Sequence, residues 1–248
     1  MNPEPRATSD KERSVLSSPV NDSDRLARLK RSIAAVRERV VEAARRSGRA
    51  AEDVRLIGVT KGVSEDVVAK AARAGLEEFG ENYVQDLPAK RAAAPDATWH
   101  FVGRLQRNKV HRVLEAADVI QTLEPGPASD RLARLASDRL GTSLDCLIEV
   151  DFTGRRVGAV PCDAVEFAER IAASPRLRVV GLMTVAPPEE DPRRAFSALR
   201  ELRDRLRERV EDSVELSMGM STDLEAAVEE GATMVRVGTA IFAEVDGR

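Results

Sequence analysis

The stretch "ELSMGMSTDLEAAVEEGATMVRVGTAIF", residues 215–242, holds the unit from which the fold can be inferred. It begins with an apolar run, passes a glycine and two hydroxyl residues, and enters an acidic, alanine-rich segment that is typical of a helix. A second apolar run, Met234–Val237, follows this segment. Strand, helix and strand in this order predict two parallel strands that are joined by a helical crossover.

The same alternation of short apolar runs and helical patterns extends back through most of the chain. Runs such as "CLIEV" and "VVGLMTV" lack strict polar alternation, as strands covered on both faces do. The eight expected strands are Leu56–Thr60, Glu78–Gly80, Trp99–Val102, Val119–Thr122, Leu144–Val150, Val179–Thr184, Val214–Met218 and Met234–Val237. The expected helices between them are Glu65–Ala74, Tyr83–Ala93, Asn108–Ala116, Ser129–Leu140, Cys162–Ala173, Pro192–Val210 and Asp223–Glu230.

Eight repeats of this kind predict one closed (β/α)8 TIM barrel, and a chain of 248 residues has the usual size for it. An open doubly wound sheet is the alternative, but no G-x-G-x-x-G motif follows the first strand to indicate dinucleotide binding. Residues 1–22 are rich in proline, serine and charge and are expected to be a disordered tail, so the barrel domain is residues 23–248. Apolar spacing predicts an extra amphipathic helix over Ser23–Ser47, ended by Gly48.

Composition excludes several classes of protein. The 39 basic and 42 acidic residues are interspersed and give a net charge of −3, so no basic field is available for nucleic acid. Only Cys146 and Cys162 occur, without a pattern for disulfides or metal, which indicates a reduced, cytoplasmic compartment. No apolar run reaches the roughly 18 residues of a membrane span, and no signal peptide is evident.

Lys61 stands where the first expected strand ends. Chemistry in such barrels takes place at the carboxyl ends of the strands, so its ammonium would look into the barrel mouth. A desolvated lysine amine is a nucleophile for carbonyl groups, as in Schiff-base formation. The alternative is an ordinary lysine whose ammonium reaches solvent at the strand end.

Small residues that suit a phosphate follow the last two strands. Ser217, Gly219 and Ser221 precede a helix start, where backbone N–H groups and hydroxyls can hold an anion. Gly238 and Thr239 follow the eighth strand, and barrel phosphate sites frequently use the loops after strands seven and eight. The alternative is that these glycines only make tight turns.

Three further polar residues are candidates for the same site. Arg236 lies between two valines in the last strand; if it points inward, it needs an acceptor such as a carboxylate, a phosphate or an aromatic nitrogen. Asn82 could line the site or only cap the next helix. His100, inside the third expected strand, could line the site or be a core histidine with satisfied hydrogen bonds.

Several long motifs resemble one known family. "VTK" at 59–61, "FGENYVQ" at 79–85, "WHFVGRLQRNK" at 99–109, "GLMTV" at 181–185 and the stretch 216–242 are similar to the pyridoxal phosphate homeostasis proteins, the YggS/PROSC family. The likeness covers nearly the whole chain from about residue 25 onward. It implies a single barrel like the N-terminal domain of alanine racemase, which binds pyridoxal 5′-phosphate (PLP) covalently.

The resemblance also implies roles for individual residues. Lys61 would carry PLP as an aldimine, and Arg236 would face the pyridine nitrogen. Asn82 and His100 would lie near the cofactor. The residues that match the phosphate-holding turns are Ser217, Gly219, Ser221, Gly238 and Thr239. The chain departs from the family at Arg156, where relatives often have a lysine two residues before the glycine, so that lysine's role is in doubt here.

The function implied is that of a non-catalytic carrier that buffers PLP, a form of vitamin B6, and contacts apo PLP-dependent enzymes transiently. A monomer, which could dimerise weakly, is expected. An arginine beside the pyridine nitrogen opposes its protonation and weakens the ring as an electron sink. One alternative is a racemase-type enzyme with Lys61 and either Tyr83 or His100 as bases. Another is a barrel that binds some other phosphorylated metabolite, with Lys61 as a phosphate-binding cation.

Overall fold

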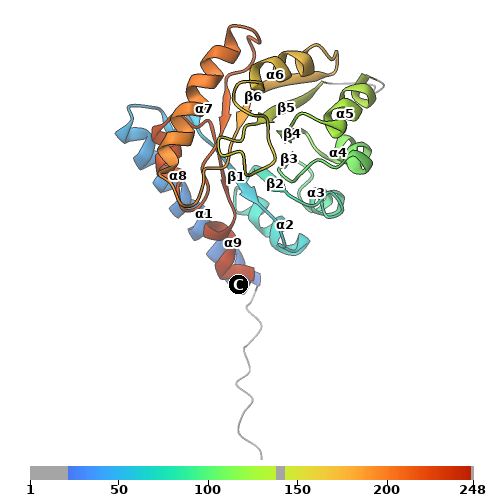
Figure 1. Cartoon of the computed structure of the whole chain (residues 1–248). Coiled ribbons are helices and arrows are strands. Elements are labelled where there is room, and N and C mark those ends of the chain that lie inside the picture. The colour runs from blue at the N-terminus through green and yellow to red at the C-terminus, as the bar shows by residue number, and fades with distance from the viewer. Residues whose placement is uncertain (1–21, 138–142, 247–248) are drawn as a thin grey trace, which may run out of the picture.

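The fold is a closed barrel of eight parallel strands surrounded by helices (Figure 1). It is seen in a computed structural model that describes residues 22–137 and 143–246. Each strand pairs with the next in chain order, and the barrel closes where Leu56 of the first strand lies beside Val235 of the last. The predicted TIM barrel is therefore confirmed, and the open sheet was the wrong alternative.

All eight strands occur within two residues of their predicted bounds. They are β1 (Arg55–Val59), β2 (Glu78–Glu81), β3 (Thr98–Phe101), β4 (Val119–Leu123), β5 (Leu144–Glu149), β6 (Leu177–Met183), β7 (Glu215–Ser217) and β8 (Met234–Val237). The α-helices are α1 (Asp22–Arg46), α2 (Glu65–Arg73), α3 (Leu87–Ala93), α4 (Val110–Ala116), α5 (Pro127–Ser137), α6 (Ala164–Ala172), α7 (Pro192–Arg207), α8 (Leu224–Glu229) and α9 (Thr239–Asp246). Short 3-10 turns occur at Ala51–Asp53 and Arg107–Lys109.

The helix predictions differ most from the structure in two places. Helix α3 begins at Leu87, four residues after the predicted start at Tyr83, since residues 83–86 form a turn before it. Helix α9 was not predicted; it starts directly after β8, where a glycine and a threonine suggested only a turn. Its buried residues Ile241, Phe242 and Val245 have helical spacing and could have indicated it.

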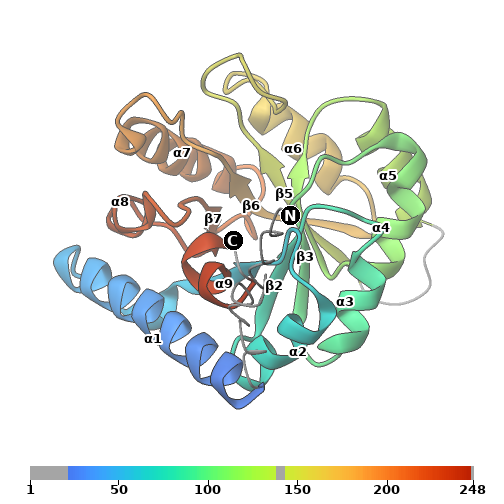
Figure 2. The same cartoon turned by 90° about the horizontal axis from the view of Figure 1, so that it is seen from below.

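The predicted extra helix, α1, is present and packs outside the barrel against α2, α8 and α9. Figure 2 shows α1 lying along the side where the barrel closes, next to α8 and α9. One face of α1 buries a stripe of apolar residues that includes Leu29, Ile33, Val36 and Val40. The predicted disordered tail, residues 1–22, lies outside the described residues except for Asp22, which begins α1.

The core has two parts, as is usual for a TIM barrel. A large layer between the strands and the helices includes Trp99 stacked on Phe79, with ring centroids 5.1 Å apart. A smaller cluster fills the barrel interior, with Ile57, Leu147 and Met234 among its members. Because the interior is filled, a ligand can enter only at the ends of the strands.

Candidate functional site

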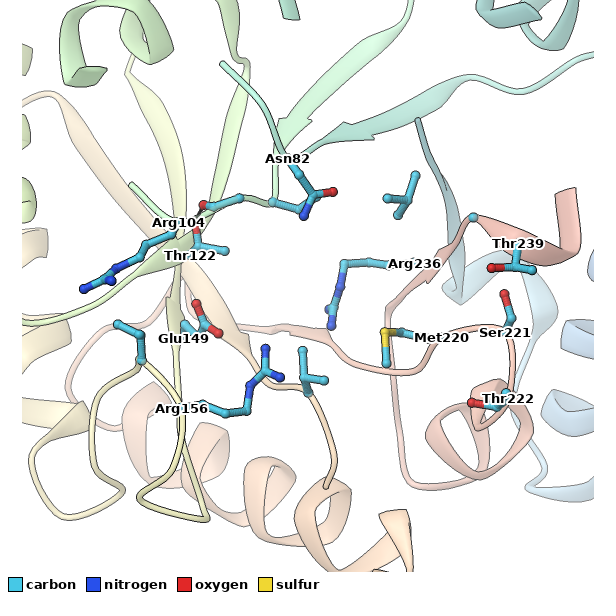
Figure 3. Close-up of a pocket in the computed structure, with 16 residues that line it drawn as sticks. Asn82, Arg104, Thr122, Glu149, Arg156, Met220, Ser221, Thr222, Arg236 and Thr239 are labelled. Carbon is cyan, nitrogen blue, oxygen red and sulfur yellow. Dashed lines mark hydrogen bonds between the residues drawn. The ribbon is translucent and has the colours of Figure 1, made fainter. Parts of the chain in front are cut away.

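A cavity of about 770 Å³ opens at the carboxyl ends of the strands (Figure 3). The part of it nearest α8 and α9 carries Ser221, Thr222, Gly238 and Thr239, which we call the hydroxyl side. Arg104, Glu149 and Arg156 form the charged side, and Arg236 lies between the two. The remaining lining residues are Val59, Asn82, Val102, Gly103, Thr122, Val157, Val185 and Met220. Five of the nine predicted cofactor residues line this cavity: Asn82, Ser221, Arg236, Gly238 and Thr239.

The turn between β7 and α8 gives the hydroxyl side its shape. Gly219 has a φ of 92°, and a Cβ on it would lie 2.4 Å from the Cβ of Ala227, so the turn needs a glycine. Its carbonyl accepts a hydrogen bond from Arg236 N at 2.9 Å, which ties the turn to β8. Gly219 does not itself line the cavity among the described residues; it shapes the turn that carries Ser221.

The second turn, after β8, leads directly into α9, whose first turn therefore faces the cavity. Ala240 N donates to Ser221 Oγ at 3.3 Å, so the two turns are in contact. A Cβ on Gly238 would lie 3.1 Å from the carbonyl oxygen of Val59, so this turn also packs closely on the end of β1. Helix N-termini with adjacent hydroxyls are suited to phosphate.

Lys61 lies in the turn that follows β1, with its side chain exposed. Ile57 belongs to the barrel interior and Val59 lines the cavity. Side chains of a strand alternate between its two faces. Thr60 N still donates to the Gly80 carbonyl at 2.8 Å, so the strand pairing continues past Val59. Lys61, two residues after Val59, is therefore expected to point toward the barrel mouth. Val59, two residues before Lys61, lies beside the Gly238 turn, although Lys61 is not among the described lining residues.

A buried ion pair lies beneath this turn. Lys90 and Glu81, both almost fully buried, are paired, and Lys90 Nζ also donates to the Thr60 carbonyl at 2.7 Å. The other Glu81 oxygen accepts from the backbone N–H groups of Asn82 and Tyr83, at 2.7 and 2.8 Å. The pair fixes the ends of β1 and β2 relative to each other, and with them Lys61 and Asn82.

Asn82 provides an observation that points to a ligand. Its Oδ1 is buried and has no hydrogen-bond partner among the described residues. The residue does not cap α3, because the residue that precedes that helix is Asp86. An unpaired buried amide is costly, so a polar ligand atom at this place would remove an unfavourable state of the protein.

Arg236 is 5% exposed and is held by two hydrogen bonds. Its Nη1 donates to Ser217 Oγ at 2.6 Å and its Nη2 to the Thr184 carbonyl at 2.9 Å. Burial lowers the pKa of the guanidinium to about 10, which still leaves it charged at neutral pH. Ser217 is completely buried and lies behind Arg236 rather than at the cavity wall.

The charged side was largely missed from the sequence. Burial raises the pKa of the Glu149 carboxyl to about 7, although the charges of Arg156 and Arg236 act in the opposite direction. Glu149 is the last residue of β5, whereas the predicted strand extended to Val150, so Glu149 was placed inside the strand and was not a candidate. The Asp151 carboxylate instead accepts from Thr153 N at 2.8 Å and Arg156 N at 2.7 Å and orders the loop that carries Arg156.

His100 lies inside the barrel and is fully buried. Its Nε2 is 2.8 Å from a Glu78 carboxylate oxygen and its Nδ1 is 2.9 Å from Gln121 Nε2, so both ring nitrogens are engaged. It does not line the cavity in the described part of the chain. Direct contact of His100 with a cofactor stays a prediction, and the placement agrees with the core-histidine alternative.

Residues 22–137 and 143–246 contain no cluster of three or more His, Cys, Asp or Glu side chains that could hold a metal ion. They also contain no helix with the length and apolar character needed to cross a membrane.

Comparison with known proteins identifies the family. The family described as "Alanine racemase, N-terminal domain" matches residues 32–245. The pyridoxal phosphate homeostasis protein of Aquifex aeolicus is 38% identical, with 84% of this chain and 95% of the relative covered. That of Pseudomonas aeruginosa is 35% identical, with 87% and 95% covered. The chain belongs to the pyridoxal phosphate homeostasis protein family.

Solved structures agree with this membership. PipY of Synechococcus elongatus, solved with PLP bound, superposes with a TM-score of 0.76 at 32% identity and covers 86% of this chain and 99% of PipY. Alanine racemase from Corynebacterium glutamicum superposes with a TM-score of 0.68, but at 15% identity and over 61% of its own length, so it shows only the shared fold.

Proposed function

We propose that this chain binds PLP in the cavity at the carboxyl ends of the strands, through a Schiff base on Lys61, and serves as a non-catalytic carrier of the cofactor. The observation that carries the proposal is the convergence of three features. The end of β1 that bears Lys61, the Gly238 turn that begins α9, and the inward-pointing Arg236 all meet at one cavity. PLP supplies an aldehyde, a phosphate and a pyridine nitrogen, and these three features suit the three groups in turn.

The residues present fit the cofactor on physical grounds. A phosphate dianion is stabilised by the helix dipole at the start of α9 and by the Ser221 hydroxyl. The unpaired Oδ1 of Asn82 indicates that a polar group is needed where the cavity meets β2. Arg236 uses two of the five N–H groups of a guanidinium within the protein, which leaves donors for a ligand acceptor.

The carrier proposal rests on what the cavity provides for proton transfer. A guanidinium near the pyridine nitrogen opposes protonation of that nitrogen and so weakens the ring as an electron sink. His100 has both nitrogens bound within the barrel, and Tyr83 is 43% exposed and absent from the described cavity lining. Neither side chain is among the described lining residues of the cavity. The relatives are named as homeostasis proteins, which supports the same proposal.

Visible absorption of the purified protein with added PLP tests the binding proposal. We expect a band of a protonated Schiff base that Lys61→Ala abolishes, while Lys30→Ala, which removes an exposed lysine on α1, leaves it intact. A wild-type protein that takes up no PLP would contradict the proposal. Equal loss of the band in both lysine variants would contradict the assignment to Lys61.

A second experiment separates the carrier from the racemase. The PLP-loaded protein is incubated with single enantiomers of amino acids and, separately, with an apo PLP-dependent enzyme. Activation of the apo-enzyme without conversion of either enantiomer is expected. Conversion at ordinary enzyme rates, on the order of 1 s⁻¹ or faster, would refute the carrier proposal.

A further inference from the structure

A continuous chain of polar side chains runs through the barrel from the cavity toward its amino end. Arg236 Nη1 is 2.6 Å from Ser217 Oγ, which is 2.7 Å from Gln121 Oε1. Gln121 Nε2 is 2.9 Å from His100 Nδ1, and His100 Nε2 is 2.8 Å from Glu78 Oε2. Ser217, Gln121 and His100 are all 0% exposed. Polar groups in a barrel interior that is otherwise packed with apolar side chains require a physical reason.

The chemistry of Arg236 sets the direction of every bond in this chain. A guanidinium only donates hydrogen bonds, so Ser217 Oγ accepts from it and must pass its own proton to another acceptor. Gln121 Oε1 is the acceptor that the described residues offer. The amide nitrogen of Gln121 then points at His100 Nδ1 and can only donate to it, so Nδ1 carries no proton.

The opposite orientation of Gln121 satisfies fewer groups. With the amide reversed, the Ser217 oxygen would face two donors, and its proton would have no acceptor among the described residues. The assigned orientation also brings Nε2 to 3.5 Å from the sulfur of Met234, a weak acceptor. All the donors therefore point from the cavity toward the amino end, and the proton of His100 lies on Nε2.

Glu78 is the acceptor at the last position of this series of hydrogen bonds. Burial acts to raise the pKa of Glu78, whereas the hydrogen bond from His100 and the charge of Arg55 act to lower it. Arg55 lies 3.6 Å from Glu78 and 2.9 Å from Glu215, so the carboxylate is anchored at the amino end. A charged acceptor at one end and a charged donor at the other stabilise every bond between them.

We propose that Gln121, His100 and Glu78 are positioning residues for Arg236: through Ser217 they hold its guanidinium in one orientation at the cavity, with His100 neutral and protonated on Nε2. The donor-to-acceptor direction of these hydrogen bonds does not depend on any ligand. Its effect on PLP binding rests on the proposed function. The two parts are tested separately.

Nitrogen NMR of histidine rings in the PLP-free protein at neutral pH tests the direction of the side-chain hydrogen bonds. The chain has only two histidines, and the other, His111, is exposed on α4 and serves as the reference. We expect His100 to be neutral with its proton on Nε2. In Gln121→Glu the new carboxylate still accepts from Ser217 but cannot donate to Nδ1, so His100 should become an imidazolium. A wild-type ring with a proton on Nδ1 would overturn the proposed direction.

A double-mutant cycle on PLP affinity tests the positioning role. Gln121→Met removes the acceptor of Ser217 and should weaken PLP binding about tenfold where Arg236 is present, and by less than about twofold in an Arg236→Met background. Gln121→Glu keeps that acceptor and should restore most of the affinity even if Gln121→Met folds poorly. Gln85→Met, at an exposed glutamine, should change nothing.

The cycle has two outcomes against the proposal. An equal loss of affinity in both backgrounds would mean that Gln121 acts through general stability and would overturn the positioning role. If Arg236→Met itself leaves PLP affinity unchanged, the assignment of Arg236 to PLP fails and the positioning role fails with it, whereas the NMR result still decides the direction of the chain.

Discussion

The two sides of the cavity are built in different ways. The hydroxyl side consists of short residues on backbone turns whose conformation is fixed by Gly219, by the bond from Arg236 N to the Gly219 carbonyl, and by the bond from Ala240 N to Ser221. The charged side consists of long side chains. In the described part of the chain, the carboxylate of Glu149 makes no hydrogen bond and the guanidinium of Arg156 no ion pair within 4.0 Å.

The two sides therefore differ in which interactions are already formed before a ligand binds. Backbone donors that are already oriented need no ordering on binding, whereas long exposed side chains lose rotamer freedom when they contact a ligand. We therefore expect substitutions at the hydroxyl side and at Arg236 to have the larger effects. Substitutions at the charged side should have smaller effects, or effects that depend on pH.

The largest contrast is expected between two of the arginines that line the cavity, Arg236 and Arg156. Arg236→Met should weaken PLP binding about a hundredfold, because it removes a fixed, buried cation whose hydrogen bonds to a ligand are strong. Arg156→Met, at an exposed loop position, should weaken it by about threefold or less. Isothermal titration or absorption titration with PLP measures both. Equal losses of PLP affinity in the two variants would contradict the expected difference between the two sides of the cavity.

Alanine substitutions at two glycines with positive φ allow the backbones of the two sides to be compared. Gly219→Ala should destabilise the fold by about 2 kcal/mol or more, because of its φ of 92° and the contact of 2.4 Å with Ala227. Gly154→Ala, in the Arg156 loop, has a φ of 67° but meets nothing within 4 Å, so about 1 kcal/mol is expected. Denaturant unfolding measures both. A Gly154 variant that is the less stable of the two would contradict this account.

Ser221 tests whether the hydroxyl side recognises phosphate. Ser221→Ala removes a hydroxyl that contacts the first turn of α9 and should weaken PLP binding by about five- to tenfold. Binding of pyridoxal, which lacks the phosphate, should hardly change. Arg104→Ala is the control from the charged side, since its side chain is 68% exposed. A similar loss for both ligands would show that Ser221 acts elsewhere than on the phosphate.

Glu149 should make stability depend on pH. Its pKa is about 7 in the folded chain against a usual value of 4.5, so the folded state holds a proton that the unfolded state releases in this window. The free energy of unfolding should therefore fall as pH rises from 4.5 to 7, by about 2 to 3 kcal/mol. In Glu149→Gln, which cannot ionise, this part of the pH dependence should disappear. An unchanged pH profile would contradict the burial of this carboxyl.

The sequence allowed most of the fold to be predicted, because apolar runs and helical spacing are local properties. It also indicated the correct end of the barrel: residues directly after strands, such as Asn82, Gly238 and Thr239, line the cavity. Glu149 was missed because its place depends on where β5 ends, and one residue of difference changes which side chain faces the cavity.

The interior chain could not be predicted for a different reason. Its members come from β2, β3, β4, β7 and β8, and nothing in a single sequence shows which polar side chains meet inside a barrel. The local signals were single polar residues inside apolar strands, namely Arg236, His100 and also Gln121. Such a residue in a buried strand indicates a hydrogen-bonded partner without identifying it.

Borohydride reduction followed by peptide mass mapping tests directly whether PLP is attached to Lys61. The wild-type protein is incubated with PLP, reduced, digested and searched for lysines that carry the mass of the reduced cofactor. We expect this mass on Lys61 at close to one equivalent, and we expect it to be lost in Lys61→Ala but kept in Lys30→Ala. Attachment mainly to another lysine, or an unmodified Lys61 in protein that retains PLP, would contradict it.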